Sequence, residues 1–176
     1  GQHDPLTATG PNECADGEGA RHANCRSRRP MGTSSPWVPS PGRGGIEVST
    51  NYEWGGKDPK GQTSFAKERP NWELPIHDLM VKNKVSIFFQ GHDHIFCTQE
   101  RDGLIYQSMP NPADDTFSMF NSDAYKSGTK APNSGHVRVT VARTQAKVEY
   151  FLAARGKDSG RKNLSVAHSY IVKPKA

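Results

Sequence analysis

The chain has 176 residues, of which 17 are Gly, 13 are Pro and only 33% are hydrophobic, against roughly 45–50% by a somewhat broader count in ordinary soluble domains. No stretch approaches the roughly 18 apolar residues that a membrane span requires, so we expect no membrane partner. The 23 Lys and Arg residues against 18 Asp and Glu give a net charge of +5, which suits an anionic substrate and ordinary solubility equally well. Because no basic stripe is interleaved with aromatic residues, nucleic acid is not the expected partner.

Residues 1–40 differ in character from the rest of the chain. Gly, Pro, Ser, Thr, Asn and charged residues dominate there, and neither a helical nor a strand period emerges. We expect a disordered or aberrant segment (a shifted reading frame or a chimeric join), followed by one domain over residues 41–176. The chain begins with Gly rather than Met, which suggests a processed or truncated product. Three cysteines, Cys14, Cys25 and Cys97, form no even framework, so neither the redox compartment nor the localisation is fixed.

One helix is predicted, over residues 71–83, after a glycine-punctuated loop region at 43–56. Its apolar stripe has the spacing i, i+3, i+4 and consists of Ile76, Leu79 and Met80. Pro75 suits a position in the first turn, and Asn83 suits the C-cap.

The rest of the domain is predicted to be mostly antiparallel sheet. Asp102-Gly103 lies between two strand-like runs, which is a strong hairpin signal. Residues 110–134 read as a polar loop. The expected strands are residues 85–90, 95–99, 104–109, 136–142, 147–153 and 165–172.

The sharpest chemical feature is the sequence Gly-His-Asp-His at residues 91–94, directly after the buried strand 85–90. Neutral imidazole is the commonest metal ligand in proteins, so His92 and His94 could bind one ion or two neighbouring ions. Asp93 could also ligate, although its neighbours suffice without it. The alternative is that two exposed loop histidines stand together by chance.

Several segments together resemble the calcineurin-like metallophosphoesterases, over roughly residues 41–172. The strand that ends in Gly-His-Asp-His is similar to the last motif of that family, Gly-His-x-His. The segments that carry the resemblance are RGGIE at 43–47, YEWGG at 52–56, RPNWELPIHDLM at 69–80, VSIFFQGHDH at 85–94 and ERDGLIYQSMP at 100–110.

The resemblance implies an α/β fold, namely the C-terminal portion of a two-sheet metallophosphoesterase sandwich with mostly antiparallel strands and one or two helices. It also implies a phosphate-ester substrate and two metal ions, commonly Fe, Mn or Zn. In the complete enzyme a hydroxide that bridges the ions attacks phosphorus, so the activity is metal-dependent phosphoric ester hydrolysis. By this resemblance His92 and His94 each ligate one of the ions.

The upstream ligand motifs of the family, Asp-x-His, Gly-Asp-x-x-Asp and Gly-Asn-His-Asp/Glu, do not occur in the chain. We therefore expect a fragment of the enzyme that is inactive by itself. The alternative function is a non-catalytic remnant or binding module with a vestigial metal site.

Three residues near the start of the domain are candidate substrate-binding residues. Arg43 and the glycines after it could offer a guanidinium and backbone N–H groups to a phosphate, and the alternative is a flexible surface loop. Tyr52 and Trp54 could form a wall of the substrate pocket, or could simply anchor their loop.

Other chemistry-bearing residues are expected to be structural. His77 is interpreted as a packing or hydrogen-bonding residue rather than a ligand, and Cys97 as a small buried hydrophobe. Asp114 and Asp115 are expected to form turns. A zinc site is not expected in the N-terminal segment, because no fourth ligand accompanies the three available residues, which are Cys14, His22 and Cys25.

Overall fold

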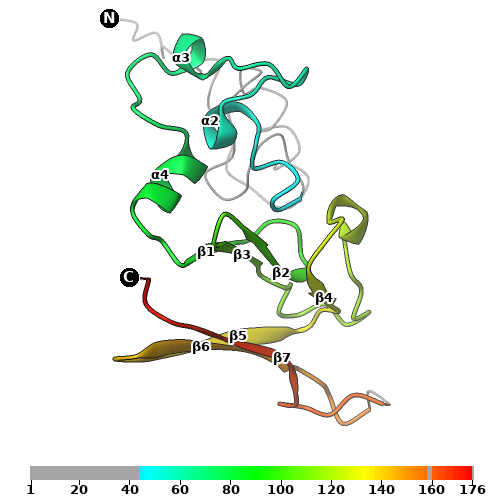
Figure 1. The fold of residues 1–176 in the computed structure, drawn as a ribbon. Coiled ribbons are helices and arrows are strands. Elements are labelled where there is room, and N and C mark those ends of the chain that lie inside the picture. The colour runs from blue at the N-terminus through cyan, green and yellow to red at the C-terminus, as the bar shows by residue number, and fades with distance from the viewer. Residues whose placement is uncertain (1–43, 158–159, 176) are drawn as a thin grey trace, which may run out of the picture. The chain divides into compact units, whose positions relative to one another are not determined.

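The structure, a computed structural model, describes residues 44–157 and 160–175. All of these residues belong to one compact unit that spans residues 34–176. The segment that was predicted to be disordered or aberrant, residues 1–40, therefore lies outside the described residues. The same holds for the expectation that no zinc site forms there, which concerned Cys14, His22 and Cys25. The described part is an α/β structure with mostly antiparallel strands in two sheets and few helices, as expected (Figure 1). In that part, no helix is both long enough and apolar enough to cross a membrane.

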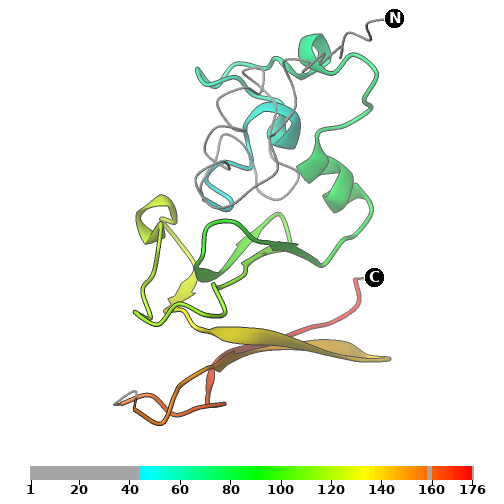
Figure 2. The same ribbon diagram turned by 180° about the vertical axis from the view of Figure 1, so that it is seen from behind.

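One sheet has four strands in the order β1-β3-β2-β4, and the other has three in the order β5-β6-β7. The strands of the first sheet are β1 (Ile87–Gln90), β2 (Phe96–Arg101), β3 (Leu104–Ser108) and β4 (Thr129–Ala131). The strands of the second, seen from both sides in Figures 1 and 2, are β5 (Gly135–Ala142), β6 (Gln145–Leu152) and β7 (Val166–Val172).

The predicted hairpin at Asp102-Gly103 is confirmed. Strands β2 and β3 pair in antiparallel fashion, with Arg101 opposite Leu104. The two residues between them both have positive φ, 52° at Asp102 and 73° at Gly103. This is the two-residue turn whose twist matches that of the flanking strands, and Asp-Gly is one of the pairs that favour it.

Strand β1 pairs with β3 in parallel, which the sequence analysis did not predict. Because β3 lies between β1 and β2, the chain leaving β1 must cross the carboxyl end of β3 before it can enter β2. Residues 91–95 make this crossing. The topology thus places the Gly-His-Asp-His segment at one end of the four-stranded sheet.

The predicted helix is shorter than expected, because α4 spans Ile76–Lys82 rather than residues 71–83. Pro75 has an extended ψ of 155° and stands before the helix, and a proline also disfavours helical backbone in the residue that precedes it. The end at Asn83 is confirmed, since its side-chain amide donates a 2.8 Å hydrogen bond to the Leu79 carbonyl. Four short elements were not predicted: α2 (Tyr52–Gly55), α3 (Phe65–Glu68), the 3₁₀ turn η1 (Ser122–Ala124) and strand β4. The last two lie in residues 110–134, which were expected to be a loop throughout.

The two sheets meet through buried aromatic side chains. Phe96 of β2 stacks on Tyr150 of β6, with ring centroids 4.4 Å apart and ring planes only 6° from parallel. Ala131 completes this cluster, and Val137 and Leu152 pack against it. Tyr150 and Leu152, which alternate along β6, therefore face this core.

A second cluster joins the helices to the hairpin. Trp54 of α2 packs with Leu104 and Tyr106 of β3, and partly buried apolar residues of α4 and β1 surround them. His77 of α4 is buried beside them, with Nδ1 2.7 Å from the Tyr106 hydroxyl and Nε2 2.9 Å from Oδ2 of Asp102. The interpretation of His77 as a packing and hydrogen-bonding residue is confirmed.

Cys97 lies in a third cluster, with Ile95 and Tyr125. It is fully buried, and burial raises the pKa of its thiol to about 12. A thiol so far from ionisation is chemically inert at neutral pH, which confirms that Cys97 acts as a small hydrophobe.

Candidate functional site

The Gly-His-Asp-His segment forms a tight loop in which the two histidines are exposed and the aspartate is buried. His92 and His94 are exposed, whereas Asp93 between them is only 1% exposed. Both histidines have left-handed backbone, with φ of 89° at His92 and 53° at His94. Such a conformation is uncommon for residues other than glycine and persists only where the surroundings impose it.

The buried carboxylate of Asp93 is the centre of those surroundings. Its Oδ2 accepts hydrogen bonds from the backbone N–H of Gly44 at 2.8 Å and from the Tyr125 hydroxyl at 2.9 Å. Its Oδ1 lies 3.0 Å from Nδ1 of His92. The aspartate therefore joins three parts of the chain: the segment at Gly44, the histidine loop and the residues around Tyr125.

The backbone of the loop is held as well. The side-chain amide of Asn121 donates to the carbonyl oxygen of Asp93 at 2.9 Å. That of Asn133 donates to the carbonyl oxygen of His94 at 2.8 Å. These two bonds hold the strained backbone from the side of the polar segment 110–134.

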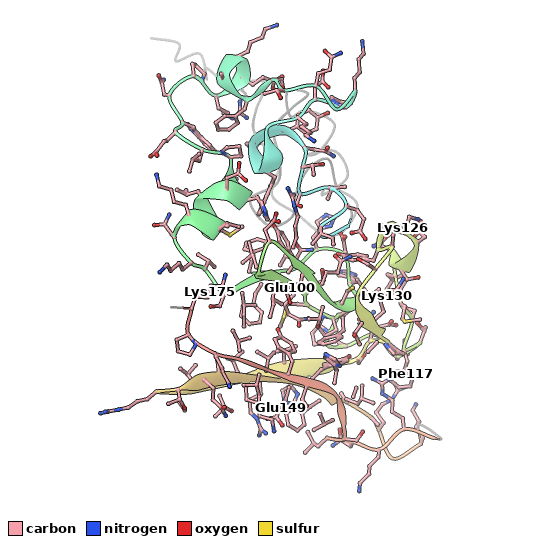
Figure 3. The ribbon with its side chains drawn as sticks, in the orientation of Figure 1. Glu100, Phe117, Lys126, Lys130, Glu149 and Lys175 are labelled. Carbon is pink, nitrogen blue, oxygen red and sulfur yellow. The ribbon has the colours of Figure 1, made fainter. Side chains whose placement is uncertain are left out.

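Tyr125 belongs to a buried polar network that extends to the end of β1. Its hydroxyl lies 2.8 Å from Oγ of Ser108, and the Gln90 amide donates to both of these oxygens. Burial raises the pKa of Tyr125 well above its usual range, so the hydroxyl keeps the proton that it donates to Asp93. Lys130, labelled on β4 in Figure 3, donates to the Tyr125 carbonyl at 2.8 Å.

An ordered loop that contains Asp114 borders the histidines. The Asp114 carboxylate accepts hydrogen bonds from the backbone N–H groups and hydroxyls of Thr116 and Ser118. These bonds, those from Ser118 first, lower the pKa of Asp114 far below its usual value. The expectation that Asp114 forms a turn is confirmed. The ring of Phe120, which follows in the chain, meets the His94 ring edge to face at a centroid distance of 6.3 Å.

The described residues alone do not form a metal site. Within residues 44–157 and 160–175, no group of three or more His, Cys, Asp or Glu side chains is placed to hold an ion. The carboxylate of Asp93 is already engaged by Gly44, Tyr125 and His92. The metal ligands predicted from the sequence in this loop are the imidazoles of His92 and His94, and both residues are exposed. Two imidazoles fit one corner of a metal centre, and further ligands are needed to close it.

The predicted site residues fall in different places. The structure brings His92 and His94 together in one loop, whereas Arg43 lies outside the described residues. Tyr52 is half-buried at the start of α2. Trp54 is 1% exposed and meets Phe88 edge-on at 5.0 Å, which is an anchoring position. The roles of Arg43, Tyr52 and Trp54 toward a substrate stay predictions.

Sequence reasoning missed the residues that hold the loop. Asn121, Tyr125 and Asn133 all lie in what read as a polar loop, and no local period marks them. The one signal was their residue type: Asn and Tyr carry donors that reach buried acceptors. Phe120 was missed for a similar reason, since an isolated Phe in a polar segment has no periodic partner.

No protein-family model matches the chain, and no curated protein matches it significantly.

Proposed function

We propose that the chain is the C-terminal part of a calcineurin-like metallophosphoesterase domain, in which His92 and His94 are metal ligands. In this proposal the chain contributes the C-terminal portion of a two-sheet sandwich, and the activity of the complete enzyme is hydrolysis of a phosphate ester. The substrate is anionic, in keeping with the net charge of +5.

The observation that carries the proposal is the conformation of the histidine loop. Two exposed histidines that flank a buried aspartate have left-handed backbone, and hydrogen bonds from Gly44, Asn121 and Asn133 hold their loop. Strain of this kind costs about 1–3 kcal/mol per residue and collects at functional sites. Ordinary surface histidines do not require such support.

A pair of metal ions would lower the pKa of a bound water and would offset charge on the phosphoryl oxygens. Asp93 and Tyr125 would contribute to such a site by holding the histidine loop in place. Asp93 fixes the loop, so that both imidazoles stay exposed at the end of the four-stranded sheet. The hydroxyl of Tyr125, protonated and buried, supports Asp93 from within.

The proposal is tested by metal and phosphate binding to the 176-residue chain. We expect zinc to bind the wild-type chain, and inorganic phosphate to bind only after zinc is loaded. The double variant His92→Ala/His94→Ala should lose at least about tenfold in zinc affinity, since removing ligands or their supports costs that much or more. Calorimetry measures both affinities.

The matched control is His136→Ala, which removes an exposed histidine from β5, outside the loop. It should bind zinc as the wild type does. Equal zinc affinity in the double variant would contradict the proposal. Zinc binding without phosphate binding would instead favour the second candidate, a non-catalytic binding module with a vestigial metal site. The lack of a third ligand among residues 44–157 and 160–175 also favours this candidate.

A further inference from the structure

Strand β5 lies at an edge of the three-stranded sheet, since the strand order is β5-β6-β7. It pairs with β6 over its whole length, from Gly135 opposite Leu152 to Ala142 opposite Gln145, without a register shift. An edge strand presents a row of backbone N–H and C=O groups to which another strand can pair. Strand β5 is thus a long, regular template for a further strand.

The register of β5 on β6 determines which backbone groups point away from the sheet. In antiparallel strands, residues that hydrogen-bond to the neighbouring strand alternate with residues that do not. The carbonyl of Ser134, just before β5, accepts a 2.9 Å hydrogen bond from the N–H of Ala153, so the even-numbered residues of β5 bond toward β6. The outward groups therefore belong to Val137, Val139 and Val141. Among the described residues, no segment beyond β6 hydrogen-bonds to the backbone of these three valines.

The opposite edge of the same sheet, β7, carries features that discourage pairing. Its register on β6 shifts between Tyr150 and Phe151, and Pro174 follows soon after the end of the strand. Bulges and prolines are devices by which proteins protect sheet edges. Strand β5 has neither, and its one charged side chain, Arg138, is paired with Glu149 of β6 at 2.9 Å.

Strand β5 is complementary to a second copy of itself. A two-fold axis at Val139 aligns residues 136–142 of the two copies in antiparallel fashion. The valine on the axis then faces its own copy, and Val137 faces Val141. All of these residues direct their N–H and C=O groups outward, so each facing pair can exchange both hydrogen bonds.

The side chains favour this register over its neighbours. With the axis at Val139, Arg138 lies opposite Thr140 of the second copy. With the axis at Arg138, two arginines would lie opposite each other, and like charges in that position are destabilising. With the axis at Thr140, the overlap would shorten from residues 136–142 to residues 138–142.

We propose that the chain forms a two-fold dimer through antiparallel pairing of β5 with β5 of a second copy, which joins the two three-stranded sheets into one. The pairing would also cover apolar surface, because Val139 is 42% exposed and Val141 is 76% exposed, on the strand face where Val137 packs against the core. This inference does not involve the histidine loop, and its failure would leave the proposed function standing.

Charges placed on the axis test the dimer and its register. Sedimentation velocity of the 176-residue chain should show a dimer for the wild type. A cross-strand pair is worth about 1.4- to 5-fold in an equilibrium constant. Val139→Lys and Val139→Glu each lose a favourable pair and gain a like-charge pair, so each alone should dimerise about 2- to 30-fold more weakly. An equimolar mixture of the two should dimerise more tightly than either alone, because Lys then faces Glu.

The matched control is Ile171→Lys, which removes another β-branched side chain, 54% exposed, from the opposite edge strand β7. It should dimerise as the wild type does. A monomeric wild type, aggregates without a defined dimer, or equal weakening by Ile171→Lys would overturn the inference.

Hydrogen exchange of the wild-type chain gives a readout that needs no variant. Where the dimer predominates, the amides of Val137, Val139 and Val141 should be protected, and dilution should remove that protection. The amides of Arg138 and Thr140, which bond toward β6, should stay protected at both concentrations. A dimer in which the three valine amides exchange freely would overturn the proposed pairing.

Discussion

Asp93 is the residue on which the conformation of the histidine loop depends most. Its carboxylate accepts from the Gly44 backbone and from Tyr125, and its backbone carbonyl accepts from Asn121. His92 and His94, in contrast, are exposed. These hydrogen bonds explain how two histidines with left-handed backbone keep their conformation, because they hold both the side chain and the backbone of the residue between them.

Replacing Asp93 with alanine should destabilise the chain. The Gly44 N–H and the Tyr125 hydroxyl would lose their acceptor while they remain buried, and each such group costs about 1–3 kcal/mol. We therefore expect Asp93→Ala to lower the free energy of unfolding by about 2–6 kcal/mol, as measured by urea denaturation. In Asp115→Ala, where the carboxylate is exposed and 3.9 Å from Arg155, the change should stay within about 0.5 kcal/mol. Equal losses in the two variants would contradict the role given to Asp93.

The sequence points to the histidine loop but not to its anchor. Gly-His-Asp-His follows a recognisable strand, so the loop could be placed from local pattern alone. The partners of Asp93 lie 49 residues before it, at Gly44, and 32 residues after it, at Tyr125. Hydrogen bonds over such separations depend on the tertiary fold, and no periodicity in one sequence encodes them.

At the scale of elements, His77 connects helix α4 to the hairpin. One ring nitrogen meets Tyr106 on β3 and the other meets Asp102 in the β2–β3 turn. The hydrogen bond with His77 is the main reason why the pKa of Asp102 lies below its usual value, with Arg101 adding to the effect. The contact thus couples the packing of a helix to the charge on a turn.

This coupling predicts how acid affects the fold. A carboxylate whose pKa is lowered in the folded chain stabilises the fold above its unfolded pKa of about 3.9, and this contribution is lost as the pH falls through the lower, folded pKa. In His77→Phe the pKa of Asp102 should rise toward its ordinary value, as measured by carboxyl NMR titration. The pKa of Glu73, which is lowered by Lys82 at the end of the same helix, serves as the control and should not move. An unchanged Asp102 titration in the variant would contradict the coupling.

The sequence predicted those elements that depend on a few neighbouring residues, namely the β2–β3 hairpin and the end of α4. The hairpin was foreseen because Asp-Gly suits a turn with two positive φ values, and the end of α4 because Asn83 can cap it. The parallel pairing of β1 with β3 was missed, since the pairing partner of a strand is set by topology. The late start of α4 follows from Pro75, which stands before the helix and disfavours helical backbone in the residue that precedes it.

At the scale of the whole described molecule, the two sheets share one small aromatic cluster. Phe96 and Tyr150 stack between them, and the Tyr170 hydroxyl donates to Gln107 at 3.1 Å. Yet the three-stranded sheet leaves many large apolar side chains exposed: Val139, Val141, Val166 and Ile171. Large apolar side chains that stay exposed are a source of self-association.

We therefore expect residues 1–176 alone to be weakly stable, prone to aggregate and without appreciable phosphatase turnover. Thermal melting, size-exclusion chromatography and assays with Mn, Fe and Zn test this, with the His92→Ala/His94→Ala variant as the background for turnover. A monomeric chain that melts cooperatively and turns over phosphate esters above that background would contradict the expectation.

The hydrogen bonds around Asp93 also bear on the order in which the chain folds. Those that hold the histidine loop join residues separated by 28, 39 and 49 positions, whereas the β2–β3 hairpin closes through two residues. Because closing a long loop is entropically costlier and slower than closing a short one, the hairpin should form early and the loop late. The geometry of the histidine loop would then be the last part of this fold to form, and the first to be lost when the segment around Gly44 detaches.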